Sequence, residues 1–254
     1  MKGITHNVPD RKDVLAFYGR SEVDLLPRQL RLLVWNVYKA RRPTWSADFQ
    51  YLTWKKDLVL LQEILLRETV IATLKKSHSL RWHLATGFTS RISPAEAGVM
   101  TGARADPLEI FYLRSPAAEP VVRLPKMVIA TVYQVENLAA GLLVLNVHAI
   151  NFVGLPKFKQ QMLQLEEIIA THEGPVLMGG DFNTWLSRRS NFLQEMTADL
   201  DMDAATFYPD RRSRYFGKAI DHVFVRGIDI ISSTCHSEIT SSDHQPIDLA
   251  LEIR

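Results

Sequence analysis

The stretch Gly179–Trp185, GGDFNTW, carries more structural information than any other part of the sequence. It follows an apolar run, Pro175–Met178, that is typical of a strand, and a polar segment compatible with a helix comes after it. In an extended backbone Asp181 and Asn183 point to one side and Phe182 to the other. A carboxylate beside a carboxamide can orient a water molecule and hold a phosphoryl oxygen. The alternative interpretation of GDFN alone is a turn in which Gly, Asp and Asn supply unusual backbone angles.

Polar side chains follow other apolar runs in the same way. Arg31–Val37 delivers Asn36, Leu58–Gln62 delivers Glu63, and Leu142–Val147 delivers His148 and, after a short step, Asn151. Ala219–Val225 carries Asp221 and His222 within it, and Ser241–Ile247 presents Asp243 and His244 just before a final strand. A single polar residue after a strand is ordinarily solvated or hydrogen-bonded within the fold. Their recurrence along one chain predicts an active site built at the ends of several strands.

These segments together resemble the endonuclease/exonuclease/phosphatase superfamily. That superfamily comprises magnesium-dependent phosphoesterases, among them DNase I-like and abasic-site nucleases, neutral sphingomyelinases and inositol-polyphosphate phosphatases. The segments that carry the resemblance are WNV, LLQE, NVHAIN, GGDFNTW, AIDHVFV and SSDHQPI, which span positions 35–247. The chain is most similar to the bacterial YafD-like branch, whose pattern also includes GVMT, found here at Gly98–Thr101.

The hydrophobic pattern predicts an α/β fold. With 46% hydrophobic and 23% charged residues, the composition is that of an ordinary globular protein. No Gly/Ser- or Pro-rich linker divides the chain, so we expect one domain over residues 1–254, with residues 1–30 as a partly irregular N-terminal extension. Helical patterns cover residues 44–56, 64–76, 157–171 and 187–200. Strand-like runs are Arg31–Val37, Leu58–Gln62, Val99–Gly102, Leu108–Leu113, Met127–Gln134, Leu142–His148, Val176–Met178, Ile220–Val225, Ile228–Thr234 and Ile247–Ile253.

This order of elements predicts a four-layer α/β sandwich. Strands joined both by hairpins and by crossover helices imply two mixed β-sheets packed face to face with helices outside. The resemblance implies the same DNase I-like architecture. The catalytic loops are then expected to gather at one edge of the sandwich.

Charge and cysteine content restrict the setting of the protein. The formal net charge is +2 with an isoelectric point near 8.6, which permits a polyanionic partner without requiring one. Cys235 is the only cysteine, so no intrachain disulfide can form. The N-terminal residues lack the apolar segment of a signal peptide, and no run is long enough to span a bilayer. We therefore expect a cytoplasmic monomer without membrane insertion or a stable protein partner.

Oxygen-bearing side chains in these motifs predict a magnesium site. Glu63 is the first choice as a metal ligand, assisted by the amide oxygen of Asn36. Magnesium prefers oxygen ligands and keeps several waters, so one or two protein ligands suffice. The sequence has no Cys/His cluster of the kind that holds structural zinc. The resemblance places Asp243 near the metal. The expected cofactor is Mg²⁺, with Mn²⁺ as an alternative.

The remaining motif residues are assigned to phosphoester hydrolysis. We expect Asp181 to orient and deprotonate the attacking water, Asn183 to hold a phosphate oxygen and His244 to donate to another nonbridging oxygen. The resemblance implies that Asp221 holds the His244 imidazole. It also implies a phosphate-binding or general-acid role for His148.

Basic and polar residues near the motifs are candidates for substrate binding. The segment Tyr208–Lys218 interleaves Arg211, Arg212, Arg214 and Lys218 with aromatic residues, a pattern that suits phosphate contacts and base stacking, although a solvated loop is the alternative. The stretch Lys39–Arg42 is predicted to flank the cleft from the other side. By resemblance, Asn151 and Arg104 face the phosphate, although the usual Ser-Arg pair is Ala-Arg here.

Several conspicuous residues are predicted to have only structural roles. His222 alternates with Asp221 and is expected to face away from the site into the core. The residues expected at the surface or in packing are His6, His78, His83, His172 and His236, and those expected in the interior are Trp35, Trp82 and Phe182. Trp185 is expected in the core, with a platform at the rim of the cleft as the alternative.

The predicted function is metal-dependent hydrolysis of nucleic-acid phosphodiester bonds, because basic loops border the expected site. The alternative is a phosphoesterase for a phospholipid, as in sphingomyelinases, or for a small phosphorylated metabolite. A membrane-active enzyme would carry an exposed apolar hairpin or an amphipathic surface helix, and neither is evident in the sequence. A third hypothesis is a binding protein with an inactive enzyme fold. Such a protein would have no chemical reason to keep the motif residues together, so this hypothesis is less favoured.

Overall fold

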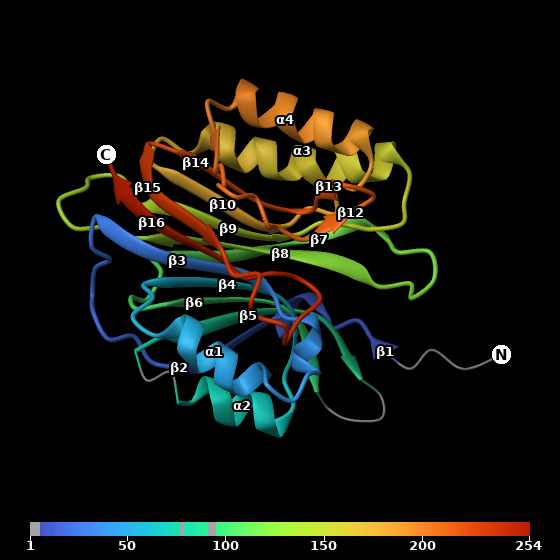
Figure 1. Ribbon diagram of the computed structural model, residues 1–254, viewed down its shortest axis with the longest axis horizontal. Coiled ribbons are helices and arrows are strands. Elements are labelled where there is room, and N and C mark those ends of the chain that lie inside the picture. Colours follow the sequence, from blue (N-terminus) through green and yellow to red (C-terminus); the bar gives the residue numbers. More distant parts are fainter. Residues whose placement is uncertain (1–5, 77–78, 91–94) are drawn as a thin grey trace.

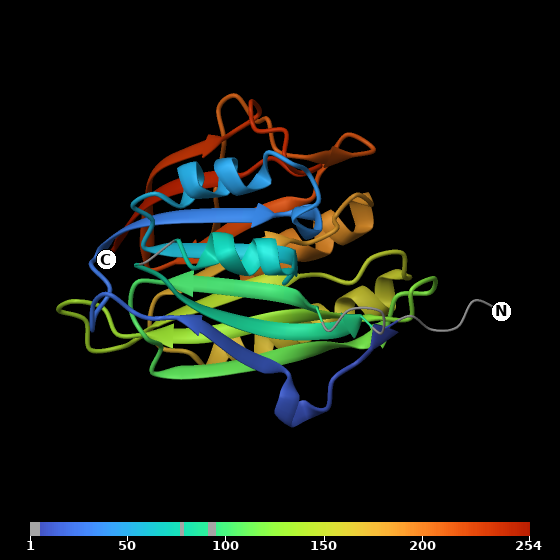
Figure 2. The same ribbon diagram turned by 90° about the horizontal axis from the view of Figure 1, so that it is seen from below.

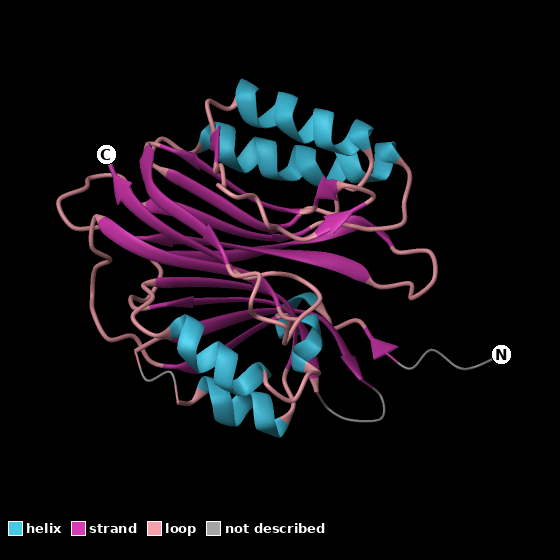
Figure 3. Cartoon of the chain, viewed as in Figure 1, coloured by secondary structure: helices cyan, strands magenta, loops and turns pink. Residues whose placement is uncertain are grey.

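Two β-sheets pack face to face, and helices cover both outer faces (Figure 1, Figure 3). The computed structural model describes residues 6–76, 79–90 and 95–254. The predicted four-layer α/β sandwich is confirmed.

The first sheet has eight strands. They are β1 (His6–Asn7), β2 (Leu15–Gly19), β3 (Gln29–Asn36), β4 (Leu58–Leu65), β5 (Arg81–Ser90), β6 (Glu96–Ala103), β15 (Ile228–Cys235) and β16 (Ile247–Ile253). The order is β1-β5-β6-β4-β3-β16-β15, and β2 pairs with β5. Only β3 and β4 are parallel, with Asn36 opposite Gln62, so their carboxyl ends meet at one edge.

The second sheet has six strands. They are β7 (Glu109–Ala118), β8 (Pro125–Tyr133), β9 (Leu142–His148), β10 (Val176–Asp181), β11 (Asp203–Ala204) and β14 (Asp221–Arg226), in the order β11-β14-β10-β9-β8-β7. Strands β9 and β10 are parallel and place His148 opposite Asp181. The antiparallel pairing of β10 and β14 brings Asp221 opposite Asp181. A separate hairpin, β12 (Arg214–Tyr215) and β13 (Lys218–Ala219), precedes β14.

The helices form the outer layers. Helices α1 (Trp45–Thr53) and α2 (Glu68–Leu74) lie across the eight-stranded sheet (Figure 2). Helices α3 (Leu155–Thr171) and α4 (Ser187–Asp199) cover the six-stranded sheet, and short 3₁₀ turns span η1 (Arg11–Asp13) and η2 (Tyr38–Ala40). Within the described residues, no helix combines the length and apolar character needed to cross a membrane.

Apolar side chains fill three layers of core. Val34 and Leu60 of one sheet and Leu177 and Val223 of the other belong to the buried cluster between the sheets. Two further clusters lie under the helices: one contains Trp35, Trp45, Phe49 and Val70, and the other contains Leu145, Met178, Phe158 and Leu193. Strands β3, β4, β9 and β10 are therefore buried on both faces, which accounts for their largely apolar sequences.

The structure differs from the sequence-based expectations in three places. Strand β5 was not predicted, because residues 82–87 are buried without an alternating pattern. Residues 64–65 end β4 and do not begin a helix, so α2 starts at Glu68. The expected N-terminal extension contributes β1 and β2, which both pair with β5.

Candidate active site

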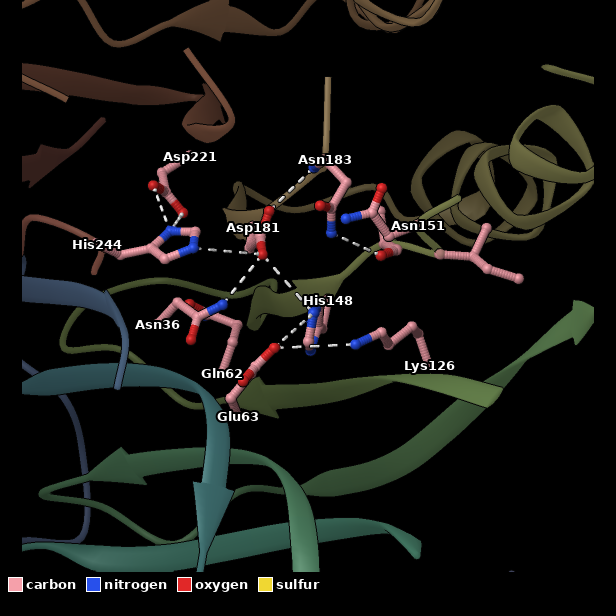
Figure 4. A network of polar contacts seen from close by, with 12 residues as sticks. Asn36, Gln62, Glu63, Lys126, His148, Asn151, Asp181, Asn183, Asp221 and His244 are labelled. Atoms are coloured by element: carbon pink, nitrogen blue, oxygen red, sulfur yellow. Dashed lines mark hydrogen bonds and ion pairs between the residues drawn. The ribbon is translucent and has the colours of Figure 1, made fainter. Parts of the chain in front are cut away.

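A cleft of 390 Å³ opens where the parallel strand pairs of both sheets end. Its lining includes Glu63, His148, Asp181, Asn183 and His244. Figure 4 shows these side chains pointing toward one another from strands of both sheets and from the loops that adjoin them. Residues that follow separate strands in the sequence are thus brought to one place.

Asp181 lies at the centre of the network. Its Oδ2 atom accepts a hydrogen bond from Asn36 Nδ2 at 3.0 Å, and its Oδ1 atom accepts one from the Asn183 backbone N–H at 2.9 Å. His148 Nε2 lies 3.6 Å and His244 Nε2 lies 4.0 Å from Oδ2. Burial raises the pKa of Asp181 to about 7, although the nearby His244 charge opposes the shift. A carboxylate with this pKa is suited to accept a proton near neutral pH.

His244 and Asp221 form a closely bonded pair. His244 Nδ1 donates to both carboxylate oxygens of Asp221, at 2.8 and 3.0 Å. Burial alone would lower the pKa of His244, but the Asp221 charge and two further carboxylates outweigh it and raise that pKa to about 10. The imidazole is therefore a cationic donor whose Nε2 faces the cleft.

His148 has the opposite electrostatic setting. Burial, with the nearby Lys126 charge, holds the pKa of His148 well below its usual range. Its Nε2 lies 3.8 Å from Glu63 Oε1 as well as 3.6 Å from Asp181 Oδ2. A neutral imidazole suits hydrogen bonding to a phosphate oxygen rather than general-acid catalysis, so the structure favours the first of the two roles that we expected.

A backbone irregularity turns Glu63 into the cleft. The pairing of β4 with β6 is irregular between Leu61 and Ile64, and Glu63 has a φ of 55° inside this bulge. A non-glycine residue in the left-handed region costs free energy, and such strain is found at functional sites. Beneath it, Gln62 Nε2 donates to Asn146 Oδ1 at 2.7 Å and so ties the two sheets together.

The donor set around Glu63 fits a hard divalent cation. Glu63 and the exposed Asp243 both line the cleft. The amide oxygen of Asn36 accepts the Tyr38 N–H at 3.2 Å and has a second lone pair that could bind a cation. One or two protein oxygens plus waters satisfy magnesium. These donors are compatible with the prediction that Glu63 and Asn36 hold the metal and that Asp243 lies near it, which stays a prediction.

A second set of side chains is close enough together to hold a cation. Ligand atoms of Asp181, Asp221 and His244 lie within 4.8 Å of one another. The hydrogen bonds between His244 Nδ1 and both Asp221 oxygens already occupy this pair, and a protonated imidazole is no metal ligand. We therefore interpret this group as catalytic.

The two asparagines are partly engaged by the protein. Asn183 Nδ2 donates to the Ala149 carbonyl at 3.0 Å, which leaves its second N–H for a ligand. Asn151 Oδ1 accepts from Trp185 Nε1 at 2.7 Å, so this residue holds the tryptophan while lining the cleft.

The loop that carries His244 is fastened to β3. Ser242 Oγ donates to the Asn36 carbonyl at 2.6 Å and accepts from the His244 N–H at 3.2 Å. Trp35 Nε1 donates to the His244 carbonyl at 3.0 Å. These bonds set the position of the imidazole relative to Asn36.

Arg189 on α4 joins two catalytic loops. Its guanidinium is fully buried and donates to the carbonyls of Ile150, Asn183 and Val153 at 2.9, 3.2 and 2.6 Å. These carbonyls belong to the loops after β9 and β10, and the last residues of those two strands are His148 and Asp181. Arg189 is therefore a positioning residue for both sides of the cleft.

We expect Arg189→Met to lower both stability and activity. The substitution keeps the volume but leaves buried carbonyls without donors, which costs on the order of 3 kcal/mol. Turnover should fall at least about tenfold, because small displacements of catalytic groups are costly. Thermal unfolding and steady-state kinetics measure the two effects, and Arg189→Lys should restore part of each. The exposed neighbour provides a matched control, Arg188→Met, and equal losses in both proteins would contradict this role.

Arg104 does not lie at the site, so its predicted phosphate contact is wrong. It follows β6 at the end where Ala103 pairs with Leu58, the opposite end of β4 from Glu63. Its guanidinium binds Glu22 at 2.9 Å and Asp57 at 3.1 Å. Arg104 stabilises the far edge of the sandwich.

The predicted arginine loop is mostly engaged internally. Arg212 and Arg214 both pair with Asp210, at 2.9 and 2.7 Å, and Arg212 also donates to the Asp221 carbonyl. Arg211 donates to Ser237 Oγ at 3.0 Å. None of the three lines the cleft, so the structure does not support them as direct substrate contacts. Arg212 instead braces the strand that carries Asp221.

Trp185 does not belong to the core, contrary to expectation. It is half-buried, lines the cleft and contacts exposed aromatic rings. His222 does face away from the site, where it bonds Thr184 Oγ1 at 2.7 Å and stacks on Phe224. Trp35, Trp82 and Phe182 are buried as predicted.

The remaining histidines have packing roles with one exception. His83 packs on Phe17, His172 contacts the Gly141 carbonyl and His236 pairs with Glu238. His6 lines the cleft beside Phe88, and His78 lies outside the described residues.

Sequence reasoning missed Lys126, whose Nζ lies 3.9 Å from Glu63 Oε1 and 3.5 Å from Glu119 Oε1. Lys126 lies near the start of β8, which runs antiparallel to β9, so the start of β8 adjoins the end that carries His148. The signal for Lys126 in the sequence is its position at the start of a strand that pairs antiparallel with the strand ending at His148. Lys39 also lines the cleft.

Comparisons with known proteins identify the family and agree with the fold. Residues 33–244 match the model of the endonuclease/exonuclease/phosphatase family. A UPF0294 protein of Klebsiella pneumoniae is 34% identical over 221 residues, which are 86% of this chain and 80% of that protein.

Solved structures share the fold at low identity. An endonuclease/exonuclease/phosphatase from Bacteroides vulgatus is 17% identical with a TM-score of 0.68, covering 89% of this chain and 99% of that one. The human Nocturnin catalytic domain with bound sulfate anion is 13% identical with a TM-score of 0.63, covering 97% and 100%. With a family match that spans nearly all the motif residues, this chain belongs to the endonuclease/exonuclease/phosphatase family.

Proposed function

We propose that the protein is a divalent-metal-dependent phosphodiesterase that hydrolyses phosphodiester bonds of nucleic acid. The observation that carries this proposal is Asp181, whose buried carboxylate lies within 4.0 Å of the His148 and His244 imidazoles, the first neutral and the second protonated. This arrangement places a general base, Asp181, next to a neutral hydrogen-bond donor, His148, and a cationic one, His244. Family membership supports phosphoric ester hydrolysis as the reaction.

Each group has a distinct part in the hydrolysis. Asp181 takes a proton from the attacking water, because its pKa of about 7 matches that task. His244, held by Asp221, donates to a nonbridging oxygen as charge grows on the phosphate. Asn183 supplies its remaining N–H to another phosphate oxygen. Bound Mg²⁺ or Mn²⁺, held by Glu63 and Asn36, would neutralise phosphate charge and stabilise the leaving oxygen.

Cationic side chains support nucleic acid as the substrate. Lys39 and Lys126 line the cleft, and both suit an anionic backbone. A phospholipid phosphoesterase is the second candidate. It is favoured by two highly exposed apolar side chains, Val121 next to the cleft residue Val122 and Phe216 against the cleft residue Trp185.

A substrate panel tests the proposal. We expect Mg²⁺-dependent cleavage of single-stranded oligonucleotides and of bis-p-nitrophenyl phosphate, with no cleavage in EDTA. Sphingomyelin vesicles serve as the comparison. Turnover of sphingomyelin with intact oligonucleotides would replace nucleic acid by phospholipid as the substrate, and no metal-dependent turnover of any phosphodiester would refute the function.

A further inference from the structure

Aromatic rings gather at the outer end of the cleft. The Trp185 ring centroid lies 6.3 Å from that of Phe152, 6.0 Å from that of Tyr215 and 5.9 Å from that of Phe216. The three partners are 60%, 50% and 79% exposed. We call these four residues the aromatic rim. Exposed apolar groups clustered beside a catalytic cleft mark a ligand surface.

The rim is built into the catalytic loops. Trp185 Nε1 donates to Asn151 Oδ1 at 2.7 Å, and the Arg189 guanidinium lies 5.8 Å from the tryptophan ring centroid. The same Arg189 bonds the Asn183 carbonyl at 3.2 Å. The position of the rim is therefore coupled to the groups that handle the phosphate.

Backbone strain also points to a binding role. Phe152 has a φ of 54° and Phe216 a φ of 48°, a region that large side chains rarely adopt. Phe152 lines the cleft and Phe216 contacts Trp185, so both strained residues hold their rings at the rim.

The strand order gives the cleft two apolar sides. Tyr215 precedes β14 at one side of the β10 and β9 ends, whereas Val122 and Leu124 precede β8 at the other side, and all three line the cleft. Figures 1 and 2 both place the β12–β13 hairpin and the β7–β8 turn at the same end of the molecule, on the right in each view. A flat apolar group can thus enter beside the rim while its phosphate faces Lys126 and His244.

We propose that the aromatic rim stacks an unpaired nucleobase next to the scissile phosphate, which makes single-stranded nucleic acid the preferred substrate class. This inference rests on the proposed function. Every base offers a flat π-face that stacks on aromatic side chains, and the adjacent phosphate is complementary to Lys39 and Lys126. In a duplex those faces are covered by neighbouring bases. Arg212 and Arg214 are paired with Asp210, so the segment around the β12–β13 hairpin offers little positive charge to bind the phosphates of a second strand.

Binding to base-free strands isolates this contact. Fluorescence anisotropy would compare a labelled oligothymidylate, an abasic strand of equal length and a duplex, using the Glu63→Gln protein so that the strands stay intact. We expect the oligothymidylate to bind about tenfold tighter than the abasic strand, as stacking of one or two bases predicts. The variants Phe152→Ala and Phe216→Ala should remove most of this difference. Trp54→Ala, which removes an exposed aromatic residue after α1, should not.

The outcomes separate this inference from the proposed function. Equal affinity for abasic and base-bearing strands, or for duplex and single strand, would overturn base stacking even if oligonucleotides are cleaved. Loss of binding to anionic phosphatidylglycerol vesicles in the rim variants, with oligonucleotide binding unchanged, would overturn it in favour of a lipid surface. Absence of oligonucleotide cleavage by the unmodified protein would instead refute the substrate in the proposed function.

Discussion

Replacing Asp181 with Asn is expected to lower kcat by about 10²-fold or more, the scale for loss of a general base. The amide can still accept the Asn183 N–H through one oxygen, but its NH₂ group cannot take a proton from water. His244→Ala should cause a loss of similar size, because it removes the cationic donor that Asp221 orients. Single-turnover measurements with saturating Mg²⁺ would report the chemical step directly.

The double variant tests whether the two groups serve one transition state. Removing both should cost far less than the product of the single losses, since groups that act as a unit are non-additive. His222→Gln is the matched control, because this histidine faces away from the cleft and bonds Thr184. A folded but inactive His222→Gln protein beside a fully active His244→Ala protein would reverse our assignment of the two histidines.

The parts of the site at strand ends could be predicted from the sequence. Buried strands such as β9 and β10 are largely apolar, so the polar residue at the end of each is conspicuous. Asn36, Asp181 and His148 are of this kind, and the structure brings all three together. Parallel pairing explains why, since it collects carboxyl ends at one edge.

Residues whose partners are distant in sequence were not predictable in this way. Arg189 occupies a helix position that reads as exposed and polar, yet its guanidinium is buried against two loops. Strand β5 lacks an alternating pattern because both of its faces are covered. Trp185 reads as apolar core, but its surroundings are the exposed rings of other loops.

The arginine loop shows how local charge was underestimated. Asp210 lies within four positions of both Arg212 and Arg214, close enough for direct pairing in a compact loop. Counting basic residues without this acidic neighbour overstated the charge available to a substrate. Arg104 was misplaced for a different reason, because an antiparallel strand carries its end to the opposite edge of the sheet.

Glu63→Gln is expected to reduce metal-dependent turnover by several orders of magnitude, on the scale of losing the metal contribution itself. The amide has the same shape and stays in the strained bulge, so thermal stability should change little. Its weaker oxygen donor should raise the Kd for Mn²⁺, which electron paramagnetic resonance of free Mn²⁺ measures without any turnover. A combined loss of activity and of metal affinity is what we expect if Glu63 coordinates the metal.

Glu68→Gln, in the exposed first turn of α2, is the matched control and should behave like the unmodified protein in both measurements. Unchanged Mn²⁺ affinity in Glu63→Gln would move the metal to other carboxylates of the cleft, with the Asp181, Asp221 and His244 group as the next candidate. Asp221→Asn would then weaken Mn²⁺ binding. If Glu63 is the ligand, Asp221→Asn should leave Mn²⁺ affinity intact and slow only the chemical step, because its carboxylate acts through the His244 imidazole.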